Sequence, residues 1–216
     1  MPLTLALLWL AFLIQHTIMS HGRLRAAMIA RLGLWPFRGV YALASMIPFG
    51  PLVYLWWTHR GEGAHLWTLP KPPAEILALL GFALVVGAIS RPAPSAAYSS
   101  NRGDRIDPIG MSAVSRHPMF VGLSMWAIGH LLANGNVVDV VFWGGFPIYT
   151  LVGVLHQDAR KAATDPRYAD FMRRTSILPF LRPGNLRFVG ARAGIGAAVG
   201  LALGVFIRMM HPIWFH

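Results

Sequence analysis

The chain alternates long apolar runs with shorter segments rich in polar residues, glycine and proline. Six apolar runs cover 3–19, 40–57, 74–89, 118–134, 137–155 and 193–210. An α-helix rises about 1.5 Å per residue, so about 20 apolar residues, with a range of about 17 to 25, cross the hydrocarbon core of a bilayer. The pattern therefore predicts an all-α protein, a polytopic membrane helix bundle with about six transmembrane helices.

Proline, glycine and charged residues mark the segments between these runs. Pro48 and Pro51 interrupt the second run and are expected to kink it unless neighbouring helices satisfy the freed carbonyl groups. Only a very short turn separates the fourth and fifth runs, so their helices must be antiparallel neighbours. A loop is expected at 91–111 and an amphipathic helix at 167–175. No internal repeat is visible, and residues 1–216 are interpreted as a single transmembrane domain.

Composition supports the membrane assignment and excludes several classes of function. Hydrophobic residues make up 55% of the chain and charged residues 12%, with a mean hydropathy of +0.51, whereas soluble proteins are about one quarter charged. The net charge of +11 does not indicate a nucleic-acid partner, because the arginines lie between apolar spans without interleaved aromatic residues. Cysteine is absent, which excludes disulfides, thiolate metal sites and a cysteine nucleophile. The expected partner is membrane lipid.

Lysine and arginine are distributed very unevenly between the two sides of a six-span arrangement. All but three of the 19 Lys and Arg residues fall on one side, and the exceptions are Arg60, Lys71 and Arg208. By the positive-inside rule the first, third and fifth loops are cytoplasmic and both termini lie outside. No positive residue precedes the first run and no small-residue cleavage site follows it, so we expect a span rather than a removable signal peptide. The expected location is a bacterial-type inner (cytoplasmic) membrane.

Two histidines of the fourth run carry the first chemical hypothesis. His117 precedes Pro118 and should lie just outside the helix that Pro118 opens, while His130 lies about 18 to 20 Å further along that helix. At about 100° per residue the two side chains point about 140° apart, so they need separate roles. An ionisable group in a span is a functional hypothesis by default, and neutral imidazoles from two helices suit the axial positions of haem iron. Gly122 and Gly129 leave space beside His130, and Trp126 lies on its face.

Each of these residues also has a simpler interpretation. A histidine in a membrane helix can hydrogen-bond a backbone carbonyl of a neighbouring helix. Arg116 can extend its charge to the membrane interface, and Trp126 can serve packing alone. Asp158, Arg173 and Arg174 are typical of a solvated helix face.

Several motifs resemble those of the NnrU family, which includes the plant and cyanobacterial 15-cis-zeta-carotene isomerases. The resemblance covers nearly the whole chain, including the first span with His16. Its motifs are Ser115–Met119 (SRHPM), Trp126–Gly135 (WAIGHLLANG), Leu155–Arg160 (LHQDAR), Thr175–Phe180 (TSILPF) and His211–Pro212. It implies a multi-span membrane protein that carries haem b.

By motif, the family's iron ligands and catalytic residues correspond to His16 and His130, with His117 as an alternative ligand that could instead position a propionate together with Arg116. In the isomerase branch the iron is understood to exchange an axial ligand with redox state and to act on a cis double bond. The bacterial branch is associated by name with denitrification and nitric oxide. The resemblance therefore implies redox-linked chemistry on a lipophilic or gaseous substrate.

A second resemblance keeps another class of function open. Arg116–Gly122 (RHPMFVG) is also similar to membrane methyltransferases of the isoprenylcysteine carboxyl methyltransferase type, although Gln157-Asp158 stands where paired glutamates are expected. In that interpretation the S-adenosylmethionine site would be lined by Arg116, His117, His156, Asp158 and Tyr168. A third, non-enzymatic possibility is a haem sensor or an assembly factor.

Overall fold

The computed structural model describes residues 1–96 and 106–214, with side chains described as far as residue 211. The expected loop at 91–111 is therefore seen only at its two ends, and Arg102, Arg105 and His216 lie outside the described residues. The α-helices are α1 (Pro2–Ser20), α2 (Gly22–Leu32), α3 (Leu34–His59), α4 (Lys71–Ser90), α5 (Pro118–Ala133), α6 (Val137–Ala162), α7 (Pro166–Arg174) and α8 (Gly190–Trp214). Two short 3₁₀ helices are η1 (Gly110–Ala113) and η2 (Pro183–Phe188). No strand occurs in this part of the chain, which confirms the all-α class.

Five helices are long and apolar enough to cross a membrane in the described ranges: α1, α3, α4, α6 and the part of α8 from Gly190 to His211. The fourth apolar run, 118–134, forms α5, which is also apolar but has 16 residues and is thus about 24 Å long. The chain is therefore a multi-pass helical membrane protein. The number of spans and the side on which the termini lie stay predictions.

The helices extend beyond the apolar runs that predicted them. α3 begins at Leu34 rather than 40, because the helix includes residues 34–39, where Pro36, Arg38 and Gly39 interrupt the apolar pattern. α6 ends at Ala162 rather than 155, because polar helical turns continue past the apolar window. Pro48 and Pro51 lie inside α3, which stays helical through both. The amphipathic helix expected at 167–175 is α7, and its start has a clear local cause. Pro166 occupies the first turn, and the Asp165 carboxylate accepts a hydrogen bond from the Arg167 backbone N–H.

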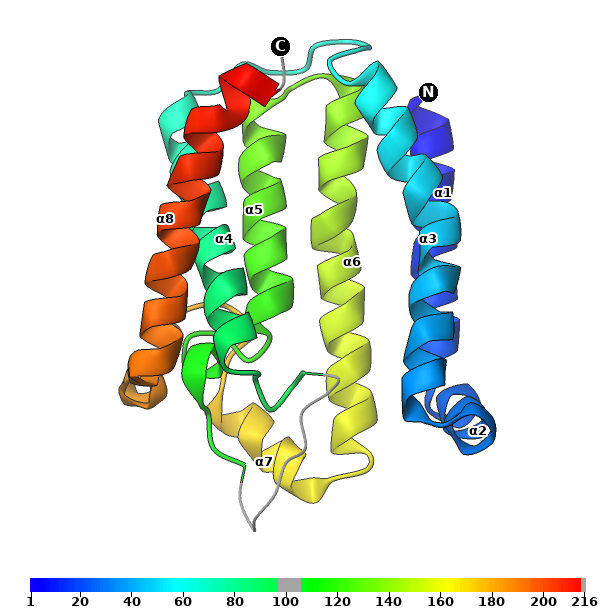
Figure 1. The fold of residues 1–216 in the computed structure, drawn as a ribbon, viewed down its shortest axis with the longest axis vertical. Coiled ribbons are helices and arrows are strands. Elements are labelled where there is room, and N and C mark those ends of the chain that lie inside the picture. Colours follow the sequence, from blue (N-terminus) through cyan, green and yellow to red (C-terminus); the bar gives the residue numbers. More distant parts are fainter. Residues whose placement is uncertain (97–105, 215–216) are drawn as a thin grey trace. The chain divides into compact units, whose positions relative to one another are not determined.

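The first of two compact units comprises Met1–Leu69 and Leu131–Tyr149, which are α1, α2, α3 and the beginning of α6. Its interior is aromatic. The Trp9 indole donates a hydrogen bond of 3.1 Å to the Phe142 carbonyl, and its ring packs edge-on against Phe146 at a centroid distance of 4.9 Å. Gly145 faces this indole so closely that a side chain at 145 would overlap it. α1 and α3 pack side by side in this unit (Figure 1).

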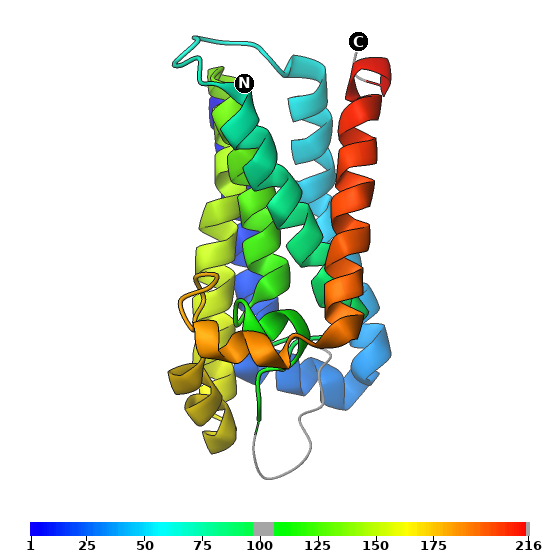
Figure 2. The same cartoon turned by 90° about the vertical axis from the view of Figure 1, so that its left-hand side faces the viewer.

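The second unit comprises the described parts of Pro70–His130 and Thr150–His216. Here α4 packs along α8 (Figure 1), and the view turned by 90° shows α4 inclined toward it (Figure 2). Small residues allow this approach: Gly196 lies against Ser90, and Gly200 against Val86. η1 and α7 cover the end of this unit at which α5 begins (Figure 1). The single-domain interpretation stays a prediction.

Candidate functional site

A buried polar cluster in the second unit joins the beginning of α5 to α6 and α7. The Asp158 carboxylate of α6 is its centre. It accepts hydrogen bonds from His117 Nε2 at 2.7 Å, from Tyr168 Oη at 2.7 Å and from Arg116 Nε at 3.0 Å, and Arg116 Nη2 lies 2.8 Å away. These residues are between 1% and 7% exposed, so a carboxylate and a guanidinium are held together out of solvent. We call these four residues the Asp158 cluster.

Backbone groups complete the Asp158 cluster. Arg116 Nη1 donates to the carbonyls of Met172 and Thr175 at 3.0 and 3.3 Å, and the Arg116 backbone N–H donates to the Ser176 carbonyl at 2.6 Å. A charge removed from water needs such a full set of partners, because an unpaired buried ion costs several kcal/mol. The Asp158 cluster therefore ties the segment before α5 to the end of α7.

Tyr168 is held as a neutral hydrogen-bond donor. Burial raises the pKa of its hydroxyl, and the neighbouring Asp158 carboxylate raises it further. The phenol therefore keeps its proton throughout the physiological range and donates to the carboxylate. The Tyr168 ring also packs against the Phe171 ring, at a centroid distance of 5.5 Å.

These contacts correct two interpretations made from the sequence. Arg116 does not extend toward the interface, and Asp158 is not on a solvated face. The two side chains form a buried ion pair inside the unit. Arg173 does lie on a solvated face, with a side chain that is 72% exposed, whereas the partly buried Arg174 pairs with Asp170 at 2.7 Å. The proposed propionate-positioning role of Arg116 and His117 is not tested, and both side chains have protein partners.

Four of the five residues expected to line a methyltransferase site thus meet, and His156 is the fifth. It lies two residues before Asp158 on α6, which places it about 200° away around the helix. Its Nε2 atom is buried and has no hydrogen-bond partner among the described atoms.

His130 lies in the last turn of α5, at the opposite end of the helix from His117. Its Nδ1 donates a hydrogen bond of 2.8 Å to the Trp126 carbonyl one turn earlier, and the Trp126 ring covers it at a centroid distance of 4.7 Å. Because a carbonyl oxygen can only accept, Nδ1 carries the proton, and the lone pair of the neutral ring is on Nε2. The side chain is partly buried. Trp126 lies on the face of His130, as predicted.

The space expected beside His130 at Gly122 and Gly129 is filled by α4. A Cβ atom at Gly129 would lie 2.5 Å from the Ala74 carbonyl oxygen, and one at Gly122 would lie 2.6 Å from the Gly81 carbonyl oxygen. These glycines therefore let α5 contact the α4 backbone directly, and they do not open room for a ligand. That interpretation of the sequence was wrong, because glycine spacing does not reveal which element fills the space.

A second histidine of the same unit lies near His130, although sequence reasoning did not pair the two. His211 lies in the last turn of α8, and its ring centroid is 6.3 Å from that of His130, with an interplanar angle of 40°. Its Nδ1 donates to the Ile207 carbonyl at 3.0 Å, so both imidazoles are fixed to their own helix in the same way. The feature of the sequence that could have indicated His211 is its position directly after the last apolar run.

His16 lies in the first unit, within an aromatic box. Its ring centroid is 4.3 Å from that of Phe12, 4.8 Å from Tyr41 and 5.3 Å from Tyr149. Its Nδ1 lies 3.3 Å from Gln15 Oε1 and 3.4 Å from Ser45 Oγ. These aromatic and polar contacts together fix the His16 ring, which is half-buried.

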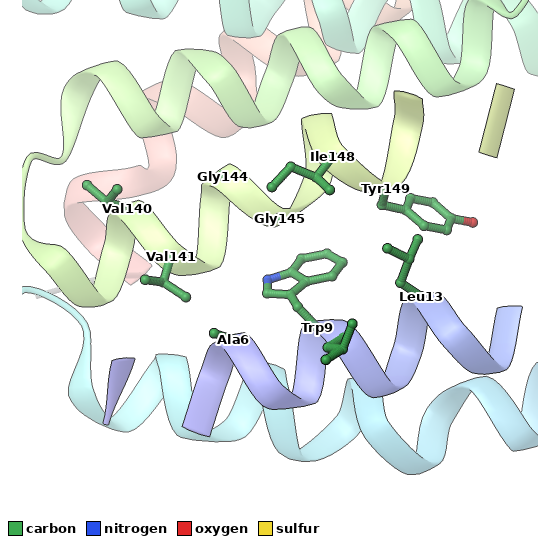
Figure 3. Close-up of a pocket in the computed structure, with 10 residues that line it drawn as sticks. Ala6, Trp9, Leu13, Val140, Val141, Gly144, Gly145, Ile148 and Tyr149 are labelled. Atoms are coloured by element: carbon green, nitrogen blue, oxygen red, sulfur yellow. The ribbon is translucent and has the colours of Figure 1, made fainter. Parts of the chain in front are cut away.

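Next to this box, α1 and the beginning of α6 line a partly open cavity of about 360 Å³ (Figure 3). That volume lies within the range of small-molecule sites. Figure 3 shows the Trp9 ring between the two helices, near Gly145, with the Tyr149 hydroxyl at one end. The wall is otherwise aliphatic, and its residues are Ala6, Trp9, Leu10, Leu13, Val140, Val141, Gly144, Gly145, Ile148 and Tyr149. Sequence reasoning missed this cavity, although two adjacent glycines inside a span were a signal.

The candidate residues thus form three groups: the Asp158 cluster and the His130–His211 pair in the second unit, and the His16 box with its cavity in the first. Among the described residues, no group of three or more His, Asp or Glu side chains is placed to hold a metal ion.

Comparison with known proteins identifies the family. The family model described as NnrU protein matches residues 4–216. The chloroplastic 15-cis-zeta-carotene isomerase of Arabidopsis thaliana is 27% identical over 168 residues, which cover 69% of this chain and 42% of the relative. The chain therefore spans less than half of that relative's length. No solved structure matches the chain. Because the family model matches nearly every residue, the chain belongs to the NnrU family.

Proposed function

We propose that this protein binds haem b through His130 and is a redox-linked isomerase of a lipophilic polyene. The observation that carries the proposal is the fixed ring of His130: its Nδ1 proton is committed to the Trp126 carbonyl, so the metal-binding lone pair is on Nε2. Metal-ligating histidines almost always have their second nitrogen anchored in this way. The relative named as a 15-cis-zeta-carotene isomerase supports the reaction type.

The residues present fit a haem better than a free metal ion. The porphyrin supplies four ligands itself, so one or two imidazoles complete the coordination, and the described residues offer no larger group of ligands. If bound, haem would supply a redox-active iron, which could promote isomerisation of a double bond. His16 is the second ligand that the family resemblance implies, and its ring is fixed by Gln15 and Ser45.

The protein's own contribution is to bind and orient an apolar substrate. The cavity between α1 and α6 offers an aliphatic and aromatic wall, with the Tyr149 hydroxyl as the polar group at one end (Figure 3). Tyr149 contacts the His16 ring, so a polyene segment in this cavity would lie beside that imidazole. We propose the bacterial cytoplasmic membrane as its location. A gaseous substrate such as nitric oxide would need no such cavity, and it is the alternative that the family name suggests.

An absorption spectrum of detergent-purified protein, expressed with ample haem, tests the proposal. The wild type and His21→Ala, a control at an exposed histidine, should show a Soret band with one haem per chain. His130→Ala should lose most of it while remaining monodisperse. Undiminished haem in His130→Ala would refute the ligand assignment. A haem-free wild type would refute the cofactor.

Turnover distinguishes an isomerase from a haem sensor or an assembly factor. Reduced, haem-loaded protein is mixed with a 15-cis polyene, and the isomers are separated chromatographically. Conversion that is lost in Gly144→Leu, whose side chain would enter open space at the cavity wall, supports an isomerase. A haem-loaded protein without conversion supports the non-enzymatic alternative.

The Asp158 cluster is a specific observation in favour of the methyltransferase alternative, because Arg116, His117, Asp158 and Tyr168 meet as that interpretation expects. Titration calorimetry with S-adenosylmethionine tests it. Saturable binding that is lost in Tyr168→Phe would favour a methyltransferase. Since the four side chains satisfy one another, we expect no binding.

A further inference from the structure

The helix α2 crosses the ends of α1 and α3 in the first unit. His21, which is extended, is the single residue between α1 and α2, and Gly33 turns the chain from α2 into α3. The φ of Gly33 is 83°, a value that favours glycine. Figure 1 and Figure 2 both show α2 at a steep angle to the two longer helices. Because α1 and α3 are long and apolar enough to cross a membrane, α2 lies along the membrane surface.

The arginines of α2 are far from the carboxylates of their own unit. They are Arg23, Arg25 and Arg31. The acidic residues of 1–69 and 131–149, all of which the structure describes, are Glu62 and Asp139. Asp139 accepts a hydrogen bond of 2.8 Å from Trp56 in the last turn of α3, and Glu62 follows that turn. With 26 residues α3 is about 39 Å long, whereas charges are screened within about 8 Å at physiological ionic strength. These carboxylates therefore do not neutralise the arginines of α2.

The side chains around α2 suit the boundary between lipid headgroups and acyl chains. Trp35, at the beginning of α3, is 74% exposed, and the Arg38 guanidinium lies over its ring at 4.7 Å from the centroid. The Arg25 guanidinium lies 5.9 Å from the centroid of the Phe37 ring. No residue of α2 is buried, and both of its leucines are exposed. Tryptophan and arginine at the end of a span are typical of the headgroup level, where each has an apolar part in lipid and a polar part in water.

We propose that Arg23, Arg25, Arg31 and Trp35, which we call the α2 corner, bind the headgroups of anionic phospholipids. A guanidinium group forms paired hydrogen bonds with a phosphate. The exposed Arg23 and Arg31 lie about 80° apart around the helix and about 12 Å apart along it, so each can bind a different headgroup. A zwitterionic lipid carries an ammonium group beside its phosphate, so a surface with uncompensated positive charge favours a lipid with net negative charge. This inference concerns a surface separate from the cavity and from His130.

Native mass spectrometry of the detergent-purified, full-length protein tests the proposal, with dioleoylphosphatidylglycerol and dioleoylphosphatidylcholine as probes. The wild type should bind phosphatidylglycerol more tightly. Each arginine near an anionic lipid strengthens binding about fivefold, so Arg23→Gln/Arg31→Gln should lower the preference by up to about 25-fold. Arg23→Lys/Arg31→Lys, which keeps the charge, should retain most of it. The matched control is Arg182→Gln/Arg187→Gln, which removes two exposed arginines from the second unit and should change the preference less than twofold.

Three results would overturn the assignment. Equal losses in the two double glutamine variants would mean that overall net charge, and not the α2 corner, attracts the lipid. Displacement of phosphatidylglycerol by an equal concentration of inorganic phosphate would indicate a site for a soluble anion. A wild-type preference that does not decrease between about 50 mM and 500 mM salt would exclude an electrostatic cause, and this measurement needs no variant. Thermal unfolding of each variant, followed by size-exclusion chromatography, confirms that the compared proteins are folded.

Discussion

Removal of the Asp158 carboxylate should destabilise the protein more than any single change on its polar surface. Asp158→Ala leaves the guanidinium of Arg116, the His117 imidazole and the Tyr168 hydroxyl without their shared acceptor, in a site where each is at most 7% exposed. Removing one member of a buried ion pair typically costs about 3 to 5 kcal/mol, because the remaining charge stays desolvated. For a chain of this length, this corresponds to a decrease in Tm of about 6 to 20 °C.

The assay is thermal unfolding of detergent-purified protein, followed by the loss of the monodisperse peak in size-exclusion chromatography. Asp170→Ala is the matched control, because its exposed carboxylate pairs with the exposed Arg173 and the partly buried Arg174, and its removal should cost less than about 1 kcal/mol. Tyr168→Phe removes one of the hydrogen bonds to Asp158 and should cost about 1 kcal/mol. A Tm of Asp158→Ala within 2 °C of the Asp170→Ala value would refute the view that the Asp158 cluster is a structural centre.

Further expectations concern helix packing, capping and the cavity. Gly129→Ala should destabilise the protein by about 1 to 3 kcal/mol, because the new Cβ atom would lie 2.5 Å from a backbone oxygen of α4. Gly194→Ala is the control and should be neutral, because a Cβ atom there would lie in open space on α8. Comparison of the Tm values of the two variants checks this. Asp165→Asn should weaken the start of α7. The hydrogen bond from the Arg167 side chain lowers the pKa of Asp165 in the folded protein. The stabilisation that Asp165 contributes should therefore be complete above a pH of about 4 and be lost as the pH falls through the pKa of the folded state. In a plot of Tm against pH, the wild type should show this loss as a slope that Asp165→Asn lacks. Gly145→Ala should force the facing indole to move, and a changed tryptophan emission spectrum should report this.

The sequence predicted the helices well, because a span needs only a run of apolar residues to be visible. Position 118 as the start of α5 followed from a local rule, since Pro118 cannot follow a helical His117, and α7 is shifted by only one residue. The end of α6 was missed because polar helical turns carry no hydropathy signal, and the beginning of α3 was missed because Pro36, Arg38 and Gly39 interrupt its apolar pattern.

The polar interior could not be predicted from local pattern. Arg116 and Asp158 lie 42 positions apart, and each alone is typical of a surface residue. Only the convergence of α5, α6 and α7 makes burial of both favourable. For His130 the sequence indicated the right residue and the right neighbour, Trp126, but not His211, because the approach of α8 to α5 depends on tertiary packing.

The long-range anchoring of Arg116 has a consequence for biogenesis. Its carboxylate partner follows 42 residues later in the chain, and its carbonyl partner at Thr175 follows 59 residues later. Until that stretch has been synthesised, the Arg116 guanidinium cannot make the contacts that neutralise it in the folded unit. A chain truncated before Asp158 therefore lacks the carboxylate that makes burial of Arg116 favourable, so the segment that precedes α5 should take up its folded position only after α6 and α7 have been synthesised.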